Sequence, residues 1–154
     1  MTRAPAAHGT QVITGDGTTL SAASYLCLPL AELLPDVARA LGDDHPDTLT
    51  TRHDLACRRG YAGVAAGAVT ALAELLSDSV RVLGDDHPDT LTTRHDLACR
   101  RGYAGDAAGA AATLAELLPD AMRVRGDAHP HTLTTVQALA FWRGEAADAA
   151  GDQS

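Results

Sequence analysis

The fold is decided by the stretch Leu41–Gly63, LGDDHPDTLTTRHDLACRRGYAG, which recurs without a change at Leu83–Gly105. A third, degraded copy, GDAHPHTLTTVQALAFWRGEA, begins at Gly126. The copies are 42 residues apart, as the positions of His45, His87 and His129 show. Self-similarity at a constant period of this size is the sequence signature of a repeat architecture.

Each copy has the start and stop signals of a pair of helices. The proline of DDHPDT lies where only the first turn of a helix tolerates it, and the aspartate behind it complements the positive end of the helix dipole. We therefore expect a first helix over 47–59, followed by a turn bracketed by Gly60 and Gly63. A second helix is expected over 64–83, where apolar residues recur at spacings of three and four, with Gly84 as its C-cap.

Related segments separate the copies: LAELLPDVARALG from Leu30, LAELLSDSVRVLG from Leu72 and LAELLPDAMRVRG from Leu114. Pro35 and Pro119 fall inside the second type of helix, so we expect a kink or a restart there, with Ser77–Asp78 as the local cap of the middle copy. The histidines that precede the prolines (His45, His87, His129) are expected to cap or pack rather than to catalyse.

The expected fold is all-α, a right-handed superhelical solenoid of stacked antiparallel helix pairs. A flexible arm over 1–19 precedes a helical repeat domain over 20–145, and a tail follows over 146–154. The domain divides into a half repeat 20–42, repeats 43–84 and 85–126, and a half repeat 127–145, with terminal helices over 29–41 and 131–143. Within the arm, the segment TQVITGDGTTL is compatible with a small hairpin.

Composition excludes several classes of function. The 154 residues carry a net charge of −8 and contain no lysine, so the chain lacks the clustered positive charge that nucleic acids require. No apolar run approaches the length of a membrane span. The first residues, Met1 to Gly17, lack the apolar region of a secretory signal. Three cysteines without an export signal are expected to be reduced thiols, which predicts a cytoplasmic protein.

The repeat resembles the tetratricopeptide repeat family, in its long 42-residue form like that of kinesin light chains. The HPDT and LG-D-HP signatures and the pattern of small and apolar residues carry this resemblance, the latter at Leu55, Ala56, Gly63, Ala68, Leu72 and Leu75 and at the matching positions Leu97, Ala98, Gly105, Ala110, Leu114 and Leu117. The chain departs from the family at Arg59 and Arg101, where aromatics are usual, and at Asp54 and Asp96, where asparagine is frequent. Helical pairs of the HEAT type are the nearest structural alternative.

The resemblance implies a non-enzymatic scaffold that binds a protein or peptide in a concave groove and needs no cofactor. Carried over position by position, it places these residues in the groove: Thr50, His53, Cys57, Tyr61, Thr92, His95, Cys99 and Tyr103. The arginines Arg59 and Arg101 are expected to lay their stems on the core and to bridge to Asp54 and Asp96.

An alternative function is self-assembly, because a solenoid repeat cannot bury its apolar face alone. The expected first and last helices would then pair between chains, either head to tail in a ring or filament or as a two-fold dimer of the last helices. The residues expected to make this contact are Leu30, Leu33, Leu34, Val37, Leu133, Val136, Leu139, Phe141 and Trp142.

A metal or thiol enzyme is the third hypothesis. His53 and Cys57 share one helix face, as do His95 and Cys99, but adjacent helices are roughly 10 Å apart. A tetrahedral site needs its ligands within about 2.0–2.3 Å of one ion, so these four residues are too far apart without rearrangement. No oxyanion-hole motif accompanies a Cys–His nucleophile. We therefore expect no metal and no catalytic residues.

Overall fold

The structure of the protein, a computed structural model, describes residues 11–13, 19–61 and 65–151. Side chains are described from residue 29 to 60 and from 67 to 151. The described elements are a two-stranded hairpin and a run of helices: β1 (Gln11–Ile13), β2 (Thr19–Ser21), α1 (Ala22–Leu41), α2 (Pro46–Tyr61), α3 (Ala65–Leu83), α4 (Pro88–Tyr103), α5 (Ala107–Arg125) and α6 (Pro130–Gly151).

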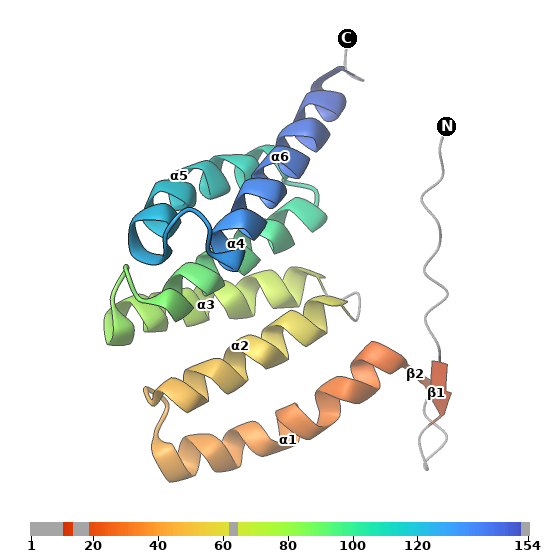
Figure 1. Cartoon of the computed structure of the whole chain (residues 1–154). Coiled ribbons are helices and arrows are strands. Elements are labelled where there is room, and N and C mark those ends of the chain that lie inside the picture. Colours follow the sequence, from red (N-terminus) through yellow and green to blue (C-terminus); the bar gives the residue numbers. More distant parts are fainter. Residues whose placement is uncertain (1–10, 14–18, 62–64, 152–154) are drawn as a thin grey trace.

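The helices stack in chain order, each against the one before it (Figure 1). We call α2, α4 and α6, which contain the HPDT-type copies, the first helices, and α1, α3 and α5 the second helices. Their leucines and alanines form two buried clusters. One centres on Leu49, Ala56, Leu72, Leu75 and Leu97, and the other on Leu91, Ala98, Ala110, Leu114, Leu117, Leu139 and Trp142. The predicted all-α repeat of helix pairs is confirmed.

The helix ends follow the predicted punctuation. The Nδ1 atoms of His45, His87 and His129 each accept a hydrogen bond of 3.2 Å from the backbone N–H two residues ahead, directly beside the proline that begins a first helix. The second helices end before Gly84 and its equivalents Gly42 and Gly126, each with a positive φ that favours glycine. The predicted capping role of these histidines is confirmed.

The ends of the first helices differ from the prediction. They continue through Gly60 and Gly102 to Tyr61 and Tyr103 instead of stopping at residues 59 and 101. The reason is a close approach between consecutive first helices: a Cβ on Gly102 would lie 2.7 Å from the Trp142 ring, and one on Gly60 would lie 2.9 Å from Nε of Arg100. These glycines make room for a neighbouring side chain and do not turn the chain.

Of the kink or restart expected at the prolines inside the second helices, the restart does not occur. Helices α1 and α5 run without a break through Pro35 and Pro119, and the Ser77 hydroxyl donates to the Ala73 carbonyl at 3.3 Å instead of capping a restart. Pro119 is exposed, whereas Leu117 and Ala121 on either side of it are buried. Burial of the apolar stripe on both sides keeps the helix continuous despite the lost hydrogen bond.

The terminal elements extend the predicted ones. Helix α1 begins at Ala22 instead of residue 29, and α6 continues to Gly151, into the segment expected to be a tail. In the predicted arm, β1 and β2 pair antiparallel with Val12 opposite Leu20, as the hairpin expectation required. The rest of that arm, residues 1–10 and 14–18, lies outside the described residues, as do 152–154 of the tail. No described helix combines the length and hydrophobicity that crossing a membrane demands.

Candidate functional site

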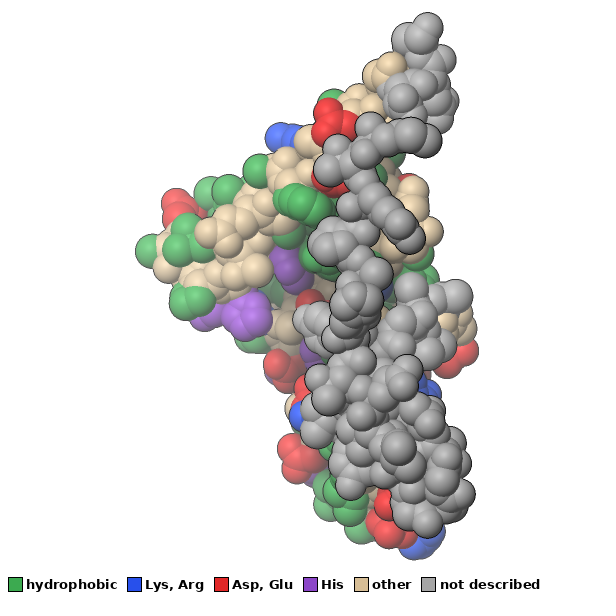
Figure 2. All heavy atoms as spheres, turned by 90° about the vertical axis from the view of Figure 1, so that its right-hand side faces the viewer, with side chains coloured by type: hydrophobic (Ala, Val, Ile, Leu, Met, Phe, Trp, Pro, Cys, Tyr) green, Lys and Arg blue, Asp and Glu red, His purple; other side chains and the backbone are tan. Residues whose placement is uncertain are grey.

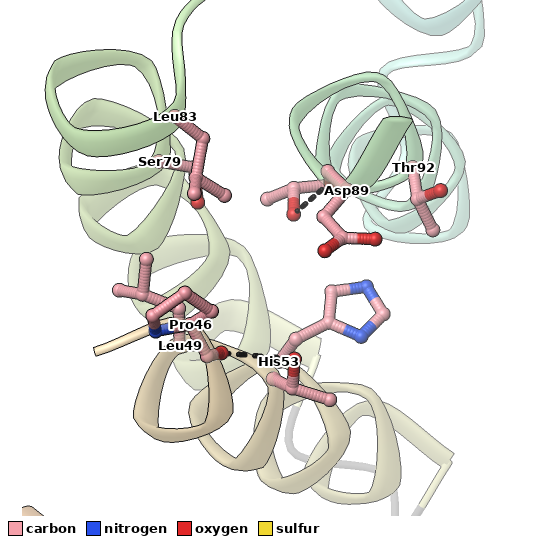
Figure 3. Close-up of a pocket in the computed structure, with 9 residues that line it drawn as sticks. Pro46, Leu49, His53, Ser79, Leu83, Asp89 and Thr92 are labelled. Atoms are coloured by element: carbon pink, nitrogen blue, oxygen red, sulfur yellow. Dashed lines mark hydrogen bonds between the residues drawn. The ribbon is translucent and has the colours of Figure 1, made fainter. Parts of the chain in front are cut away.

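The first helices line a groove that begins between α2 and α4. Thr50 and His53 from α2 and Thr92 from α4 line a small pocket of about 60 Å³. Figure 3 shows the His53 ring extending from α2 toward α4. Apolar side chains of Leu49 and Leu83 form part of its wall. Asp89 also lines this pocket; sequence reasoning did not place it in the groove, because it was interpreted only as a helix-dipole residue.

A second, larger hollow of about 440 Å³ lies between α4 and α6. It contains three further predicted groove residues, His95, Cys99 and Tyr103, together with Phe141 and Trp142 of α6. Asp96 lines this hollow and also contacts His53, which lines the first pocket, so the two hollows adjoin. Histidine side chains gather next to hydrophobic ones on one side of the molecule (Figure 2). The side chain of Tyr61, also predicted in the groove, is outside the described residues.

Three aromatic rings form an edge-to-face cluster in the second hollow. The Trp142 ring centroid lies 4.9 Å from that of Tyr103 and 4.7 Å from that of Phe141. Trp142 is only 4% exposed, whereas Tyr103 is 66% and Phe141 50% exposed. The buried central ring holds two exposed rings in place, an arrangement suited to anchoring a partner's side chain.

The groove threonines already use their hydroxyl groups. Thr50 donates to the Pro46 carbonyl and Thr92 donates to the Pro88 carbonyl, each at 3.0 Å. The Thr92 hydroxyl also accepts a hydrogen bond of 2.8 Å from Arg125. Both threonine hydroxyl groups are therefore already engaged within the chain.

Between the two hollows, α2 and α4 are joined by a polar cluster that we call the first junction. His53 Nε2 hydrogen-bonds Asp96 Oδ2 at 2.8 Å, and the Cys57 Sγ lies 3.7 Å from each of these two atoms. The hydrogen bonds to Asp96 and then to Cys57 raise the pKa of His53 to about 10. Burial alone would raise the pKa of Asp96, but its hydrogen bond to His53 and the charge of that ring keep it below the usual value. The junction therefore holds an imidazolium–carboxylate pair at neutral pH.

The equivalent second junction, between α4 and α6, lacks the carboxylate because Ala138 occupies the position of Asp96. His95 Nδ1 lies 3.2 Å from the Thr135 hydroxyl, and Cys99 Sγ lies 3.6 Å from His95 Nε2. Burial lowers the pKa of His95 and raises that of the Cys99 thiol. The histidine and cysteine of the second junction are therefore neutral, whereas their counterparts at the first junction belong to a charged cluster.

Sequence reasoning missed the partner of His53. Asp96 was expected to pair with Arg101 and Asp54 with Arg59, but neither pair is among the ion pairs of the described residues. The set His53, Cys57, His95 and Cys99, which helix spacing had already argued against as a metal site, is not the cluster that the structure forms. Among the described residues, the metal-ligating side chains that converge within 4.8 Å of one another are His53, Cys57 and Asp96. The 42-residue offset between the copies was the available signal, because it places position 96 on the helix next to position 53.

The residues expected to mediate self-association fall into two groups. Leu139 and Trp142 are 6% and 4% exposed and belong to the chain's own core, which corrects the expectation that they form an outer face. Their side chains pack inside the array because α6 lies against α4 and α5. The other members are exposed or half-buried: Leu33 is 52%, Leu133 49%, Val136 45% and Phe141 50% exposed, and Leu30, Leu34 and Val37 are half-buried.

The two exposed leucines are buried wherever their repeat position has a neighbouring helix. Leu133 of α6 corresponds to Leu49 and Leu91, which are 4% and 2% exposed, and these pack against the following second helix. Leu33 of α1 corresponds to Leu75 and Leu117, each 1% exposed and packed in the same clusters. The outer faces of α1 and α6 are thus the two halves of an interface that occurs twice inside the chain.

Comparison with known families supports the repeat. Residues 48–89 match the model of the tetratricopeptide repeat family. No curated protein matches the chain as a relative. Repeats of this family generally bind proteins and are usually non-catalytic. The matched segment runs from the first turn of α2 through α3 to the start of α4, one complete unit of the array. Residues 48–89 are therefore a tetratricopeptide repeat of the kinesin light chain type.

Proposed function

We propose that the protein is a non-enzymatic interaction scaffold that binds a peptide or protein segment along the groove of α2, α4 and α6. The observation that carries this proposal is the aromatic cluster in the second hollow, where buried Trp142 supports exposed Tyr103 and Phe141. Aromatic anchors supported by buried neighbours supply most of the binding energy in typical protein interfaces.

The chemistry of the groove suggests the kind of segment that it holds. The second hollow accepts a large apolar or aromatic side chain, which would pack against Tyr103 and Phe141. In the adjoining first pocket, the Asp89 carboxylate is 63% exposed and provides an acceptor for a backbone N–H or a basic side chain. The proposed ligand therefore carries an apolar anchor with a hydrogen-bond donor at one side.

Selection from a displayed peptide library on the immobilised chain tests this proposal, followed by calorimetry on the best synthetic peptide. Tyr103→Ala is expected to weaken binding at least about tenfold, because hot-spot aromatics contribute on the order of 2 kcal/mol. Glu116→Ala, on the exposed face of α5, is the matched control and should leave the affinity unchanged. Peptide-induced shifts of the backbone amide NMR signals that centre on α3 and α5 would contradict the proposal. Equal effects of the two variants on the affinity would contradict it as well.

We propose self-association as a second function, favoured by the repeat positions of Leu33 and Leu133. A second copy's α1 would cover the exposed face of α6 as α5 covers that of α4. The sequence supports this occupant, because α1 and α5 share the segment LAELLPD, at Leu30–Asp36 and Leu114–Asp120. The contact would be head to tail, which leads to a ring or a filament.

Two blocked-end variants separate the possible arrangements. Leu33→Asp blocks the α1 face and Leu133→Asp the α6 face, so each alone is expected to be monomeric by analytical ultracentrifugation. An equal mixture of the two should form a dimer, because one intact α6 face meets one intact α1 face. If Leu33→Asp alone still dimerises, the contact is a two-fold pairing of α6, and if wild type stays monomeric at high concentration, this function is excluded.

A further inference from the structure

The first junction brings three different ligand atoms to one point between two helices. His53 and Cys57 are one turn apart on α2, and Asp96 faces them from α4. The separations are 2.8 Å from His53 Nε2 to Asp96 Oδ2 and 3.7 Å from Cys57 Sγ to each of these atoms. The His53 and Asp96 side chains are 19% and 30% exposed, so the point is sheltered but open on one side.

This arrangement is unsuited to a nucleophile relay. In a Cys–His–Asp relay the thiol uses one ring nitrogen and the carboxylate the other. Here both Cys57 Sγ and Asp96 Oδ2 approach the same atom, Nε2 of His53. The nearest carboxylate to Nδ1, that of Asp54, is 3.6 Å away, which is too long for a hydrogen bond. Convergence of nitrogen, sulfur and oxygen on one point is instead the geometry of ligands around an ion.

The separations fit a tetrahedral ion closely. Ligands bound at about 2.0–2.3 Å in a tetrahedron are roughly 3.3–3.6 Å from one another. The two distances to Cys57 Sγ already have this size, and opening the contact between His53 and Asp96 by about 0.5 Å completes the fit. Thiolate and imidazole together select Zn²⁺ over Ca²⁺ or Mg²⁺, which prefer all-oxygen sites.

We propose that His53 Nε2, Cys57 Sγ and Asp96 Oδ2 bind one Zn²⁺ ion between the first helices of consecutive repeats. A water molecule or a ligand group from the groove completes the tetrahedron, since His53 also lines the first pocket. The ion ties α2 to α4 by three ligand bonds. Its binding releases two protons, the one on the Cys57 thiol and the one that His53 Nε2 shares with Asp96.

The second junction provides a matched control inside the same chain. His95 and Cys99 have the spacing of His53 and Cys57, with Cys99 Sγ 3.6 Å from His95 Nε2. Ala138 stands where the third ligand, Asp96, stands at the first junction. The proposal therefore requires one ion per chain, bound through Cys57 and not through Cys99.

Titration of the full chain with Co²⁺, a spectroscopic substitute for Zn²⁺, tests the site directly. One equivalent is expected to produce tetrahedral visible bands and a thiolate charge-transfer band. These bands should persist in the double variant Cys27→Ser/Cys99→Ser, which retains Cys57 alone. They should vanish in Cys57→Ser and weaken in Asp96→Asn, whose Zn²⁺ affinity should fall at least about tenfold in competition with a chromophoric chelator.

Two results would overturn the proposal. One is the absence of a thiolate band in wild-type protein whose circular dichroism shows folded helices. The other is a band that survives Cys57→Ser but disappears in Cys99→Ser. Asp54→Asn is the control for a general loss of negative charge and should bind Zn²⁺ as wild type does, because Asp54 lies outside the three-ligand cluster.

Discussion

The two junctions between consecutive first helices are built on the same sequence, yet the pKa of the junction histidine is raised at the first and lowered at the second. Each starts with the segment HDLACRRGY, at His53–Tyr61 and His95–Tyr103. At the first junction Asp96 faces the histidine, and the pKa of His53 rises to about 10. At the second, Ala138 takes that position, and burial lowers the pKa of His95. The difference shows that the next repeat, not the local sequence, decides the chemistry of these side chains.

The glycine contact at the two junctions differs in the same way. Gly60 receives the Arg100 side chain, and Gly102 receives the Trp142 ring at the same repeat position. The arginine also donates to the Cys57 carbonyl at 3.3 Å, whereas the tryptophan packs with Tyr103 and Phe141. The first junction is therefore polar and the second apolar, although one helix, α4, takes part in both.

The largest effect is expected from removing the apolar contact of the second junction. Trp142→Ala should lower the free energy of unfolding by about 3 kcal/mol, since burial of a tryptophan is worth roughly 3–5 kcal/mol. Phe141→Ala, at a half-exposed neighbouring position, should cost less than about 1 kcal/mol. Urea unfolding followed by circular dichroism measures both, and equal costs would show that Trp142 does not hold the junction.

Adding a methyl group at the two glycines separates the junctions further. Gly102→Ala should destabilise by about 1–2 kcal/mol, because crowding against a rigid ring costs more than the helix propensity that alanine gains. Gly60→Ala should change stability by less than about 0.5 kcal/mol, since the Arg100 stem can move aside. In the Trp142→Ala background the penalty at Gly102 should disappear. A penalty that persists there would place the close contact on the backbone instead.

The charged pair of the first junction predicts a pH-dependent stability in chelator-treated protein. Because the pKa of His53 is raised from 6.5 to about 10, its contribution is complete below pH 6.5 and is lost as the pH rises through about 10. The lowered pKa of Asp96 adds a loss as the pH falls below 3.8. Asp96→Asn should therefore cost about 1 kcal/mol near pH 6 and progressively less toward pH 10. A difference between variant and wild type that is constant with pH would contradict the pairing.

The smallest effect is expected from giving the second junction the carboxylate of the first. Ala138→Asp places a carboxylate opposite His95, which should raise the pKa of His95 above its usual value instead of leaving it lowered. The histidine ring resonances in an NMR titration of chelator-treated protein report this shift. Ala140→Asp, at an exposed position of α6, is the control and should leave the pKa of His95 lowered. An unchanged pKa of His95 in Ala138→Asp would show that a carboxylate at this position is not what raises the pKa of the junction histidine.

Much of the fold could be predicted from local sequence signals. The repeat period, the proline after each capping histidine and the glycine after each second helix mark nearly every helix end. These signals are local because they depend on backbone groups within one turn. The errors came where packing outweighs a local preference: at Ser77, which does not cap a restarted helix, and at Gly60 and Gly102, which are packing positions.

By itself, the sequence determined that this chain is a stack of helix pairs, which helices form it and which of their faces are apolar, because periodicity and capping are properties of neighbouring residues. Only the tertiary structure decided which side chains meet across the stack. It joined His53 and Cys57 to Asp96, placed Trp142 in the core and left Leu33 and Leu133 exposed. The physical reason is that two identical segments acquire different charge, burial and contacts when the helices packed against them differ.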